Sequence, residues 1–473
     1  MVFIEGFGKR VMGSKLPRWS RMGKRLTAPQ PRSGHLLRVL GAGFGIAVGV
    51  GTTIGSGILR TPGEIAGQLG SVPLVIGVWA LGGVYALLCC SSITELGTML
   101  PNAGGFYVYA SRAFGPRIGF VVGCCNAVSQ AVALAYLSVA LGEFSAGLFP
   151  RLAGHLQLVG VAGLVLLSLL NWLGLRPGSR AQEVTSVAKS LGLLALVTAS
   201  FVTSASVNTH ATAHLPGPAH SLFLGLMVAL QGVIITYDGW YGPIYFVEED
   251  KDPSRNLPRA MFGTVLCCAA IYLLINAAYL HVLGMGHLAG SQLPAADTAM
   301  LVFGKYGRRF ILLISVIAVL SSINAVLMLL PRILFAMGRD GLLPRSLSGV
   351  NKGGTPAMAL LLSCLAGILL VLSGTYDSLI AVASILFVGT YLSCFAALLV
   401  LRKREPDLAR PHRAWCYPWT TLLVLLVSAA FLFGSMVGDL RHSMFTVILI
   451  LLSYAAAILM TRKNSEATLL QEK

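Results

Sequence analysis

Long apolar segments recur along almost the whole chain, and this pattern restricts its fold more than any other feature. A helix that crosses a bilayer needs roughly 20 mostly apolar residues, and about twelve segments of the chain meet that requirement. They lie at 37–69, 73–99, 116–149, 155–175, 182–204, 220–247, 259–284, 309–337, 356–374, 378–401, 416–437 and 443–461. We therefore predict an all-α integral membrane protein with twelve transmembrane helices.

Composition and charge support this class and give the chain an orientation. Of the 473 residues, 11% are charged, whereas a soluble protein carries about 25%. The first 35 residues are basic and contain no apolar run, so no cleavable signal peptide is expected. Every second loop is also basic, through Arg112, Arg117, Arg176, Arg180, Lys251, Arg255, Arg259, Arg332, Arg339, Arg345, Lys352, Arg402, Lys403, Arg404, Arg410 and Arg413. Because positive loops stay in the cytoplasm, we predict a multi-pass protein of the inner (plasma) membrane with both termini inside.

The net charge of +17 does not indicate nucleic-acid binding, because its distribution follows membrane topology. Contact between the basic tail and anionic lipid is the simpler interpretation. The nine cysteines show no CxxC spacing, so neither a zinc nor a redox site is supported. Without a metal cluster, a Ser/His/Asp set or a phosphate loop, we expect no metal, no cofactor and no enzyme activity.

Residues 50–63, VGTTIGSGILRTPG, interrupt the first apolar segment with glycine and hydroxyl residues. Two of the glycines have GxxxG spacing, which is typical of close helix packing. The IGSGI sequence is tighter than packing requires, with Ser56 between its glycines. An interrupted membrane helix is tolerated where a cavity or ligand satisfies its backbone. We therefore predict that the helix ends near Thr53 and restarts near Ile58.

A second interruption is predicted in the sixth segment, at ITYDGWYGPIYFVEED. Pro243 removes a backbone donor and clashes with the preceding turn, and Asp238 is costly at membrane depth unless it faces a cavity or partner. Breaks in the first and sixth helices indicate a LeuT-type inverted repeat of five plus five helices, with the binding site at the midplane.

The predicted parts are a cytoplasmic tail (1–35), a ten-helix transport core (36–402), accessory helices 11 and 12 (403–462) and a cytoplasmic C-terminal tail (463–473).

The interrupted helices predict a particular ligand chemistry. A restarting helix offers free N–H groups and a positive dipole end, which suit a carboxylate. A helix that ends offers free carbonyls and a negative end, which suit an ammonium group. Together they suit the zwitterionic head of an α-amino acid.

The chain resembles the amino acid–polyamine–organocation superfamily of permeases, and within it bacterial relatives of the light subunits of heteromeric amino acid transporters. The resemblance covers roughly residues 35 to 463 and implies an amino acid transporter. It rests on four motifs, GTTIGSGILRTPGEI, ITELGTMLPNAGGFYVYASRAFG, YDGWYGPIYFVEEDKDPSRNLPRAM and SSINAVLMLLPRILFAMGRDGLLP.

The resemblance implies that the two breaks hold the substrate's head group. The carboxylate would be bound at residues 55–57, and the ammonium by carbonyls near Thr53 and in residues 235–238. Ile235 falls where many relatives carry an aromatic lid, which leaves the aromatic residues after it as candidates for closing over the substrate, although Trp240 equally fits core packing. The predicted binding residues are Thr53, Ile54, Gly55, Ser56, Gly57, Ile235, Tyr237, Asp238, Gly239, Trp240, Tyr241 and Asn126.

Two ionisable residues inside the membrane have alternative interpretations. Lys189 lies about 10 Å along the fifth helix, and its side chain either snorkels to the surface or, as the resemblance implies, replaces a sodium ion. In the second case its ammonium bridges carbonyls of the first helix and the hydroxyl of Ser321 or Ser322. Asp238 either pairs with a cationic substrate or takes part in proton coupling, or it hydrogen-bonds backbone exposed in the break.

Charged residues are also predicted on the cytoplasmic side. Glu95, near the inner end of the second helix, is expected to have a structural or gating role. Glu248 and Glu249 are expected to form a solvated cluster with Arg255 and Arg259, which is also a candidate for closing the inner side.

The leading prediction is a sodium-independent secondary transporter of neutral L-amino acids, either an exchanger or a proton-linked permease. A cationic amino acid or polyamine transporter is the alternative, on account of Asp238. The expected partners are an amino acid substrate and the lipid bilayer. In animal light subunits a cysteine between the third and fourth helices links a heavy chain, but the corresponding FPRLAGH loop has none, so no covalently linked heavy chain is expected.

Overall fold

The interrupted first segment forms two helices, α2 (Ala42–Thr53) and α3 (Gly57–Leu69), bent by 49° at the break. The intervening residues form no helix, and α3 begins one residue before the predicted restart. The interruption predicted from the IGSGI sequence is therefore confirmed.

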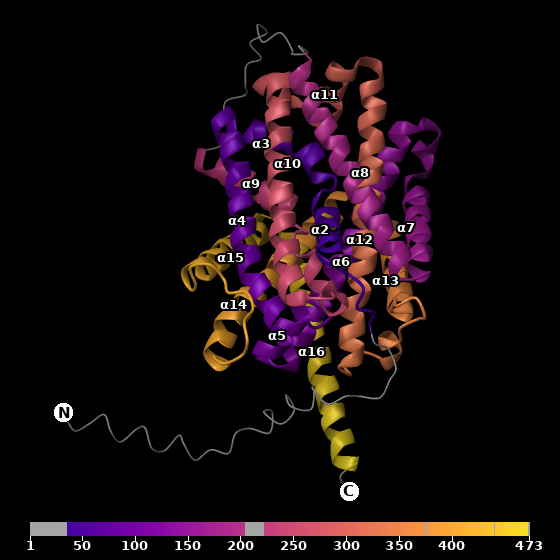
Figure 1. Cartoon of the computed structure of the whole chain (residues 1–473), viewed down its shortest axis with the longest axis vertical. Helices are drawn as coiled ribbons and strands as arrows, with labels where there is room; N and C mark the ends of the chain where they lie inside the picture. The colour runs from indigo at the N-terminus through magenta and orange to yellow at the C-terminus, as the bar shows by residue number, and fades with distance from the viewer. Residues whose placement is uncertain (1–35, 204–221, 374–375, 439, 472–473) are drawn as a thin grey trace, which may run out of the picture. The chain divides into compact units, whose positions relative to one another are not determined.

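The computed structural model describes residues 36–203, 222–373, 376–438 and 440–471, so the basic tail at 1–35 lies outside the described part (Figure 1). The other helices before the masked loop are α4 (Val72–Met99), α5 (Phe106–Phe114), α6 (Pro116–Leu148), η1 (Pro150–His155), α7 (Leu156–Trp172) and α8 (Leu175–Val202). After that loop come α9 (Leu222–Tyr237), η2 (Gly242–Glu249), α10 (Pro253–Gly290), α11 (Pro294–Phe303), η3 (Gly304–Tyr306), α12 (Gly307–Arg339), η4 (Arg345–Ser348), α13 (Ala357–Ser373), α14 (Tyr376–Arg404), α15 (Trp419–Gly438) and α16 (Leu440–Gln471).

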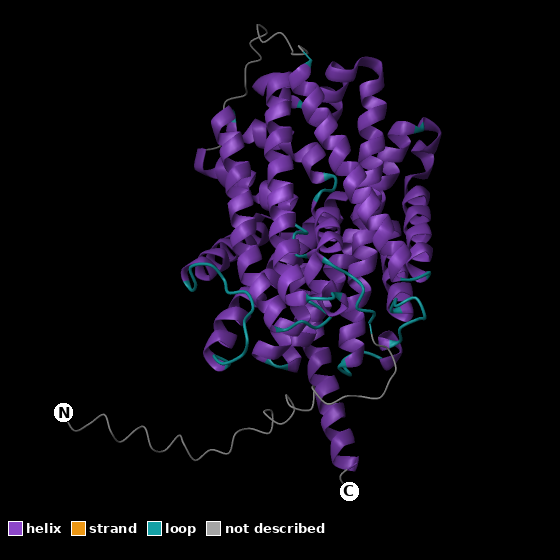
Figure 2. Ribbon diagram, viewed as in Figure 1, coloured by secondary structure: helices purple, strands orange, loops and turns teal. Residues whose placement is uncertain are grey.

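The described residues form helices and no strand, as Figure 2 shows. Within the described ranges, ten helical segments are long and apolar enough to cross a membrane, and the bent pair α2–α3 raises this number to 11. The ninth predicted segment contains the shorter apolar helix α13, of 17 residues. Each of the twelve predicted segments contains helix among the described residues, so the all-α membrane class is confirmed, and the number of twelve spans stays a prediction.

Burial separates the inner helices from those that face lipid. The most apolar stretches of α6 and α12 are 72% buried, whereas those of α15 and α16 are 22% buried. Small residues allow the inner backbones to approach closely. A Cβ added at Gly160 of α7, for example, would lie 2.4 Å from the carbonyl oxygen of Ser138 in α6. The helix α2 contacts α8, α10 and α12, which places the first break inside the bundle (Figure 1).

The second predicted break is also present, but its continuation differs from an α-helix. The helix α9 ends at Tyr237, a turn follows, and the chain restarts as the 3₁₀ helix η2. Gly239 in the turn has φ of +107°, a conformation that L side chains rarely adopt, and a Cβ there would lie 2.6 Å from the backbone carbon of Thr52. This close approach brings the two breaks into contact.

One basic residue lies in a different place from the one predicted. Arg332 was assigned to a cytoplasmic loop, but it lies on α12 with only 2% of its side chain exposed. Its guanidinium is buried because it pairs with Glu249. Pro331 does not end the helix, and α12 continues to Arg339.

Candidate functional site

The two breaks form one structural unit in the middle of the bundle. The hydroxyl of Thr52 donates to the carbonyl of Gly239 at 2.6 Å. On the other side of the unit, a Cβ added at Gly57 would lie 3.1 Å from the side chain of Thr236. Residues separated by almost two hundred positions in the sequence are therefore held against each other by backbone and hydroxyl groups.

The helix ends at this unit have opposite polarity. The first turn of α3 begins at Gly57, with Ser56 as its N-cap, and the N–H groups of a first turn lack intrahelical acceptors. The ends of α2 and α9, at Thr53 and Tyr237, contribute carbonyls without intrahelical donors. A positive and two negative dipole ends thus meet within the membrane-spanning region.

Lys189 supplies donors to the carbonyls of the first break. Its ammonium nitrogen lies 2.9 Å from the carbonyl oxygen of Gly51 and 2.6 Å from that of Ile54. Ser322 of α12 donates to the same Gly51 carbonyl at 2.8 Å. The lysine is fully buried, so its ammonium is directed to the break and does not snorkel to the surface.

Ser321 belongs to a different set of contacts from Ser322. Its hydroxyl lies 3.1 Å from the amide nitrogen of Gln182 and 3.3 Å from the hydroxyl of Ser186. Both Gln182 and Ser186 donate to the carbonyl of Ala47 in α2. The network continues through Asn324, which donates to Gln182 at 2.9 Å. Gln182 and Ser186 were not predicted, because their only signal was their spacing of four residues on the helix of Lys189.

Tyr272 of α10 was also missed. Its hydroxyl lies 2.9 Å from the carbonyl oxygen of Thr53 and 3.0 Å from that of Thr236. The ring is fully buried and packs against Trp79 and Tyr237. A tyrosine inside an apolar segment shows no sequence signal that distinguishes this role from ordinary packing.

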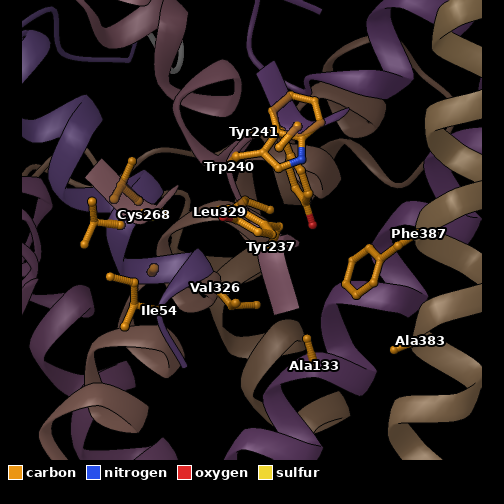
Figure 3. Close-up of a cluster of buried hydrophobic side chains, with 14 of the residues drawn as sticks. Ile54, Ala133, Tyr237, Trp240, Tyr241, Cys268, Val326, Leu329, Ala383 and Phe387 are labelled. Carbon is orange, nitrogen blue, oxygen red and sulfur yellow. The ribbon is translucent and has the colours of Figure 1, made fainter. Parts of the chain in front are cut away.

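Asp238 and Ile235 line a cavity of about 30 Å³ beside the second break. Its other wall comes from α6 and α14, whose lining residues are Tyr136, Ala383, Ser384, Phe387, Val388 and Tyr391. In Figure 3, Ala383 and Phe387 project from α14 toward the second break. Such a volume holds about two water molecules.

Three further predicted binding residues, Trp240, Tyr241 and Asn126, belong to an aromatic layer that contacts this cavity through Tyr391. Tyr241 packs against Trp240, and its hydroxyl lies 3.4 Å from a carboxylate oxygen of Asp238. The side chain of Asn126 donates to the hydroxyl of Tyr245 at 2.7 Å. Asn126 therefore supports the aromatic layer and is not among the residues that line the cavity.

Ion pairs join η2 to the C-terminal part of α12. The pair Arg332–Glu249 has nitrogen–oxygen distances of 2.8 and 2.9 Å, and Arg339 binds Glu248 at 2.8 Å. Glu249 is fully buried, so the prediction that it forms a solvated cluster is wrong. The carboxylate finds a guanidinium on α12, while Arg255 pairs with Asp252.

Glu95 forms a second buried charge cluster. Its carboxylate binds the guanidinium of Arg402 at 2.7 and 2.6 Å and accepts the backbone N–H of Ala414 at 2.7 Å. These contacts tie α4 to the end of α14 and to the segment that follows. Burial lowers the pKa of His412 in that segment, although Glu95 acts in the opposite direction.

Comparison with known proteins identifies the family. A family model described as amino acid permease matches residues 44–454. The serine/threonine exchanger SteT of Bacillus subtilis is 27% identical over 409 residues, covering 85% of this chain and 92% of that protein. The b(0,+)-type amino acid transporter 1 of Mus musculus is 27% identical over 429 residues, or 88% and 86% of the two chains. The Asc-type amino acid transporter 1 of Mus musculus is 30% identical over 375 residues, or 76% and 70%. The chain therefore belongs to the amino acid permease family of the amino acid–polyamine–organocation superfamily, and it is a multi-pass membrane protein of amino acid transport.

Proposed function

We propose that the protein is a sodium-independent secondary transporter of neutral L-amino acids, working as an exchanger or a proton-linked permease. The observation that carries this proposal is the ammonium of Lys189 on the carbonyls of Gly51 and Ile54. A fixed cation at the end of α2 satisfies carbonyls that would otherwise suit a bound sodium ion. Transport then needs no sodium.

The head group of the substrate would bind at the two breaks. The N–H groups of Gly55, Ser56 and Gly57 suit the carboxylate, because the N-terminus of α3 is a positive dipole end. Carbonyls near Thr53 and in residues 235–238 suit the ammonium. In this proposal Ile54, Tyr237 and Gly239 shape the site and the other predicted aromatic residues close it.

The membrane arrangement follows the same proposal. The helix α13 would be the ninth of twelve spans, residues 36–402 would form an inverted-repeat core of five plus five helices, and α15 and α16 would be accessory. Movement of the broken-helix bundle against the rest would give alternating access. Both termini would lie in the cytoplasm beneath the plasma membrane. The protein would have no covalently linked heavy chain and no enzyme activity.

The substrate's side chain is the least constrained part of the proposal. Ile234, Ile235 and Phe387 give the cavity an apolar wall, which supports a neutral side chain. The serine/threonine exchanger among the relatives supports the same class. A cationic amino acid or polyamine is the second candidate, because the carboxylate of Asp238 lies in the same cavity and would pair with a cation.

Exchange of a radiolabelled amino acid in proteoliposomes tests both parts of the proposal. Small and medium neutral L-amino acids should compete best in a panel of unlabelled competitors, and replacing sodium by choline should leave the rate unchanged. Collapse of exchange in choline would contradict the role of Lys189. Strong competition by arginine or lysine alone would favour the second candidate.

A further inference from the structure

An ion pair between Arg60 and Glu143 joins the second half of the first interrupted helix, α3, to α6. A guanidinium nitrogen of Arg60 lies 2.6 Å from a carboxylate oxygen of Glu143. The same guanidinium lies over the buried ring of Phe144, 5.0 Å from its centroid. The side chains of Arg60 and Glu143 remain 29% and 34% exposed, so a small polar molecule can reach both charges without unfolding either helix.

The pair lies close to the first break, on the side where α3 leaves it. Arg60 is the fourth residue of α3, about 4.5 Å along the helix axis from Gly57. On α6, the side chain of Leu137 lies 4.0 Å from a Cβ added at Gly55. Glu143 follows Leu137 on the same helix at an axial distance of about 9 Å. A molecule bound at the pair is therefore within about 10 Å of the free N–H groups at the start of α3.

Helix stability does not account for an arginine at this position. The N-terminus of a helix favours acidic side chains and disfavours basic ones, yet the first turn of α3 contains no acidic residue and Arg60 is its fourth residue. An ion pair that is partly exposed to solvent also contributes little to folding. The arginine instead extends the positive field of the α3 N-terminus away from the break, where an approaching carboxylate would meet it first.

We propose that Arg60 and Glu143 form an entry site for zwitterionic amino acids, an inference that rests on the proposed transport function. In the proposed mechanism the interrupted helices move against the rest of the bundle, so opening this side separates α3 from α6 and the two charges from each other. A zwitterion between them accepts hydrogen bonds from the guanidinium through its carboxylate and donates to Glu143 through its ammonium group. Each charge keeps a partner while the helices part.

The entry site favours one of the candidate substrate classes over another. A polyamine carries ammonium groups and no carboxylate, so it can pair with Glu143 but places a like charge beside Arg60. Juxtaposed like charges weaken binding. The head group of an α-amino acid satisfies both residues, whatever side chain it carries. The pair therefore selects amino acids and disfavours polyamines before the substrate reaches the break.

The test is Arg60→Gln, assayed by uptake of radiolabelled L-alanine into intact cells, which samples the outer face in the proposed membrane arrangement. The half-saturating concentration should rise about tenfold, as expected for loss of one charge-assisted hydrogen bond. In inside-out membrane vesicles it should be unchanged, because the entry site serves one face only. Glu143→Gln should give the same one-sided rise through loss of the partner for the ammonium group, so either variant that reaches the membrane decides the question.

Arg112→Gln is the matched control. Arg112 of α5 pairs with Glu405, the residue that follows α14, at 2.9 Å, and their side chains are 38% and 27% exposed. This pair has similar geometry and exposure, but it involves neither interrupted helix. Its loss should leave the half-saturating concentration for L-alanine unchanged on both faces.

The possible results separate an entry site from a simple tie between helices. If the pair only held α3 against α6, its loss would favour the open state of the outer face, and the half-saturating concentration in Arg60→Gln would fall or stay the same. Either result would overturn the entry site and leave the proposed transport intact, as would an equal rise on both faces. Failure of the wild-type protein to transport any amino acid would instead overturn the proposed function, and the inference with it.

Discussion

Replacing Glu249 by glutamine would leave the guanidinium of Arg332 buried without a charged partner. The two side chains are 0% and 2% exposed and share two short hydrogen bonds. Arg332 also lies over the ring of Phe246, 4.6 Å from its centroid. The pair joins η2 to α12, so the perturbation acts on the segment that follows the second break.

The expected loss in the free energy of unfolding is large for a substitution that preserves the shape of the side chain. Removing one partner of a buried ion pair costs about 3–5 kcal/mol, because the remaining charge stays desolvated. The pair Arg339–Glu248 provides an internal comparison, since its side chains are 36% and 20% exposed. Partly exposed pairs are worth about 1 kcal/mol or less, so Glu248→Gln should have a much smaller effect.

Urea-induced unfolding in mixed detergent micelles, followed by tryptophan fluorescence, measures the free energy of unfolding of each variant. The double variant Glu249→Leu/Arg332→Met should recover most of the lost stability, because replacing both partners by apolar residues leaves no unpaired charge. A difference below about 1 kcal/mol between Glu249→Gln and Glu248→Gln would refute the reasoning. A double variant that is no more stable than Glu249→Gln would also refute the reasoning.

Three further predictions concern other parts of the molecule. Ser56→Leu should abolish substrate binding in a folded protein, because it fills the break before α3; wild-type affinity in the exchange assay would contradict this. Lys189→Met removes the lysine donor from the Ile54 carbonyl and leaves the Gly51 carbonyl with the Ser322 hydroxyl. It should reduce exchange by at least about tenfold, so wild-type rates in choline medium would argue against its role. Partial burial raises the pKa of Asp340, whose side chain is still 31% exposed, against the lowering effects of Tyr107 and Arg339. Its ionisation therefore destabilises the fold as the pH rises through this raised pKa, and Asp340→Asn should raise the thermal midpoint at pH 8 but not at pH 4.

Much of the architecture was predictable because it depends on local chemistry. A long apolar segment in a bilayer satisfies its own backbone as a helix, and each of the twelve predicted segments contains helix in the described part of the chain. The positions of both breaks were also predictable, since glycine, serine and proline act on the adjacent backbone. The 3₁₀ form of η2 was missed, because a helix's hydrogen-bond pattern after a turn depends on what it packs against.

The partners of the polar side chains could not be predicted in the same way. Lys189 was expected to meet carbonyls of the first helix, but only through the family resemblance. The chain alone left open whether the lysine turns inward or toward the surface. Arg332 was misplaced because a basic residue after an apolar run usually marks a cytoplasmic loop. A buried arginine whose partner lies far away in the chain shows the same sequence pattern.

The sequence by itself therefore determined a helical membrane protein, the two points where its helices break, and the polarity of the ends exposed there. Tertiary structure decided what meets those ends, namely Lys189, Ser322 and the bridging hydroxyl of Tyr272. The physical reason is distance along the chain. Hydrogen bonds between residues 135 to 271 positions apart depend on how helices pack, and packing is the joint result of many side chains rather than of any single motif.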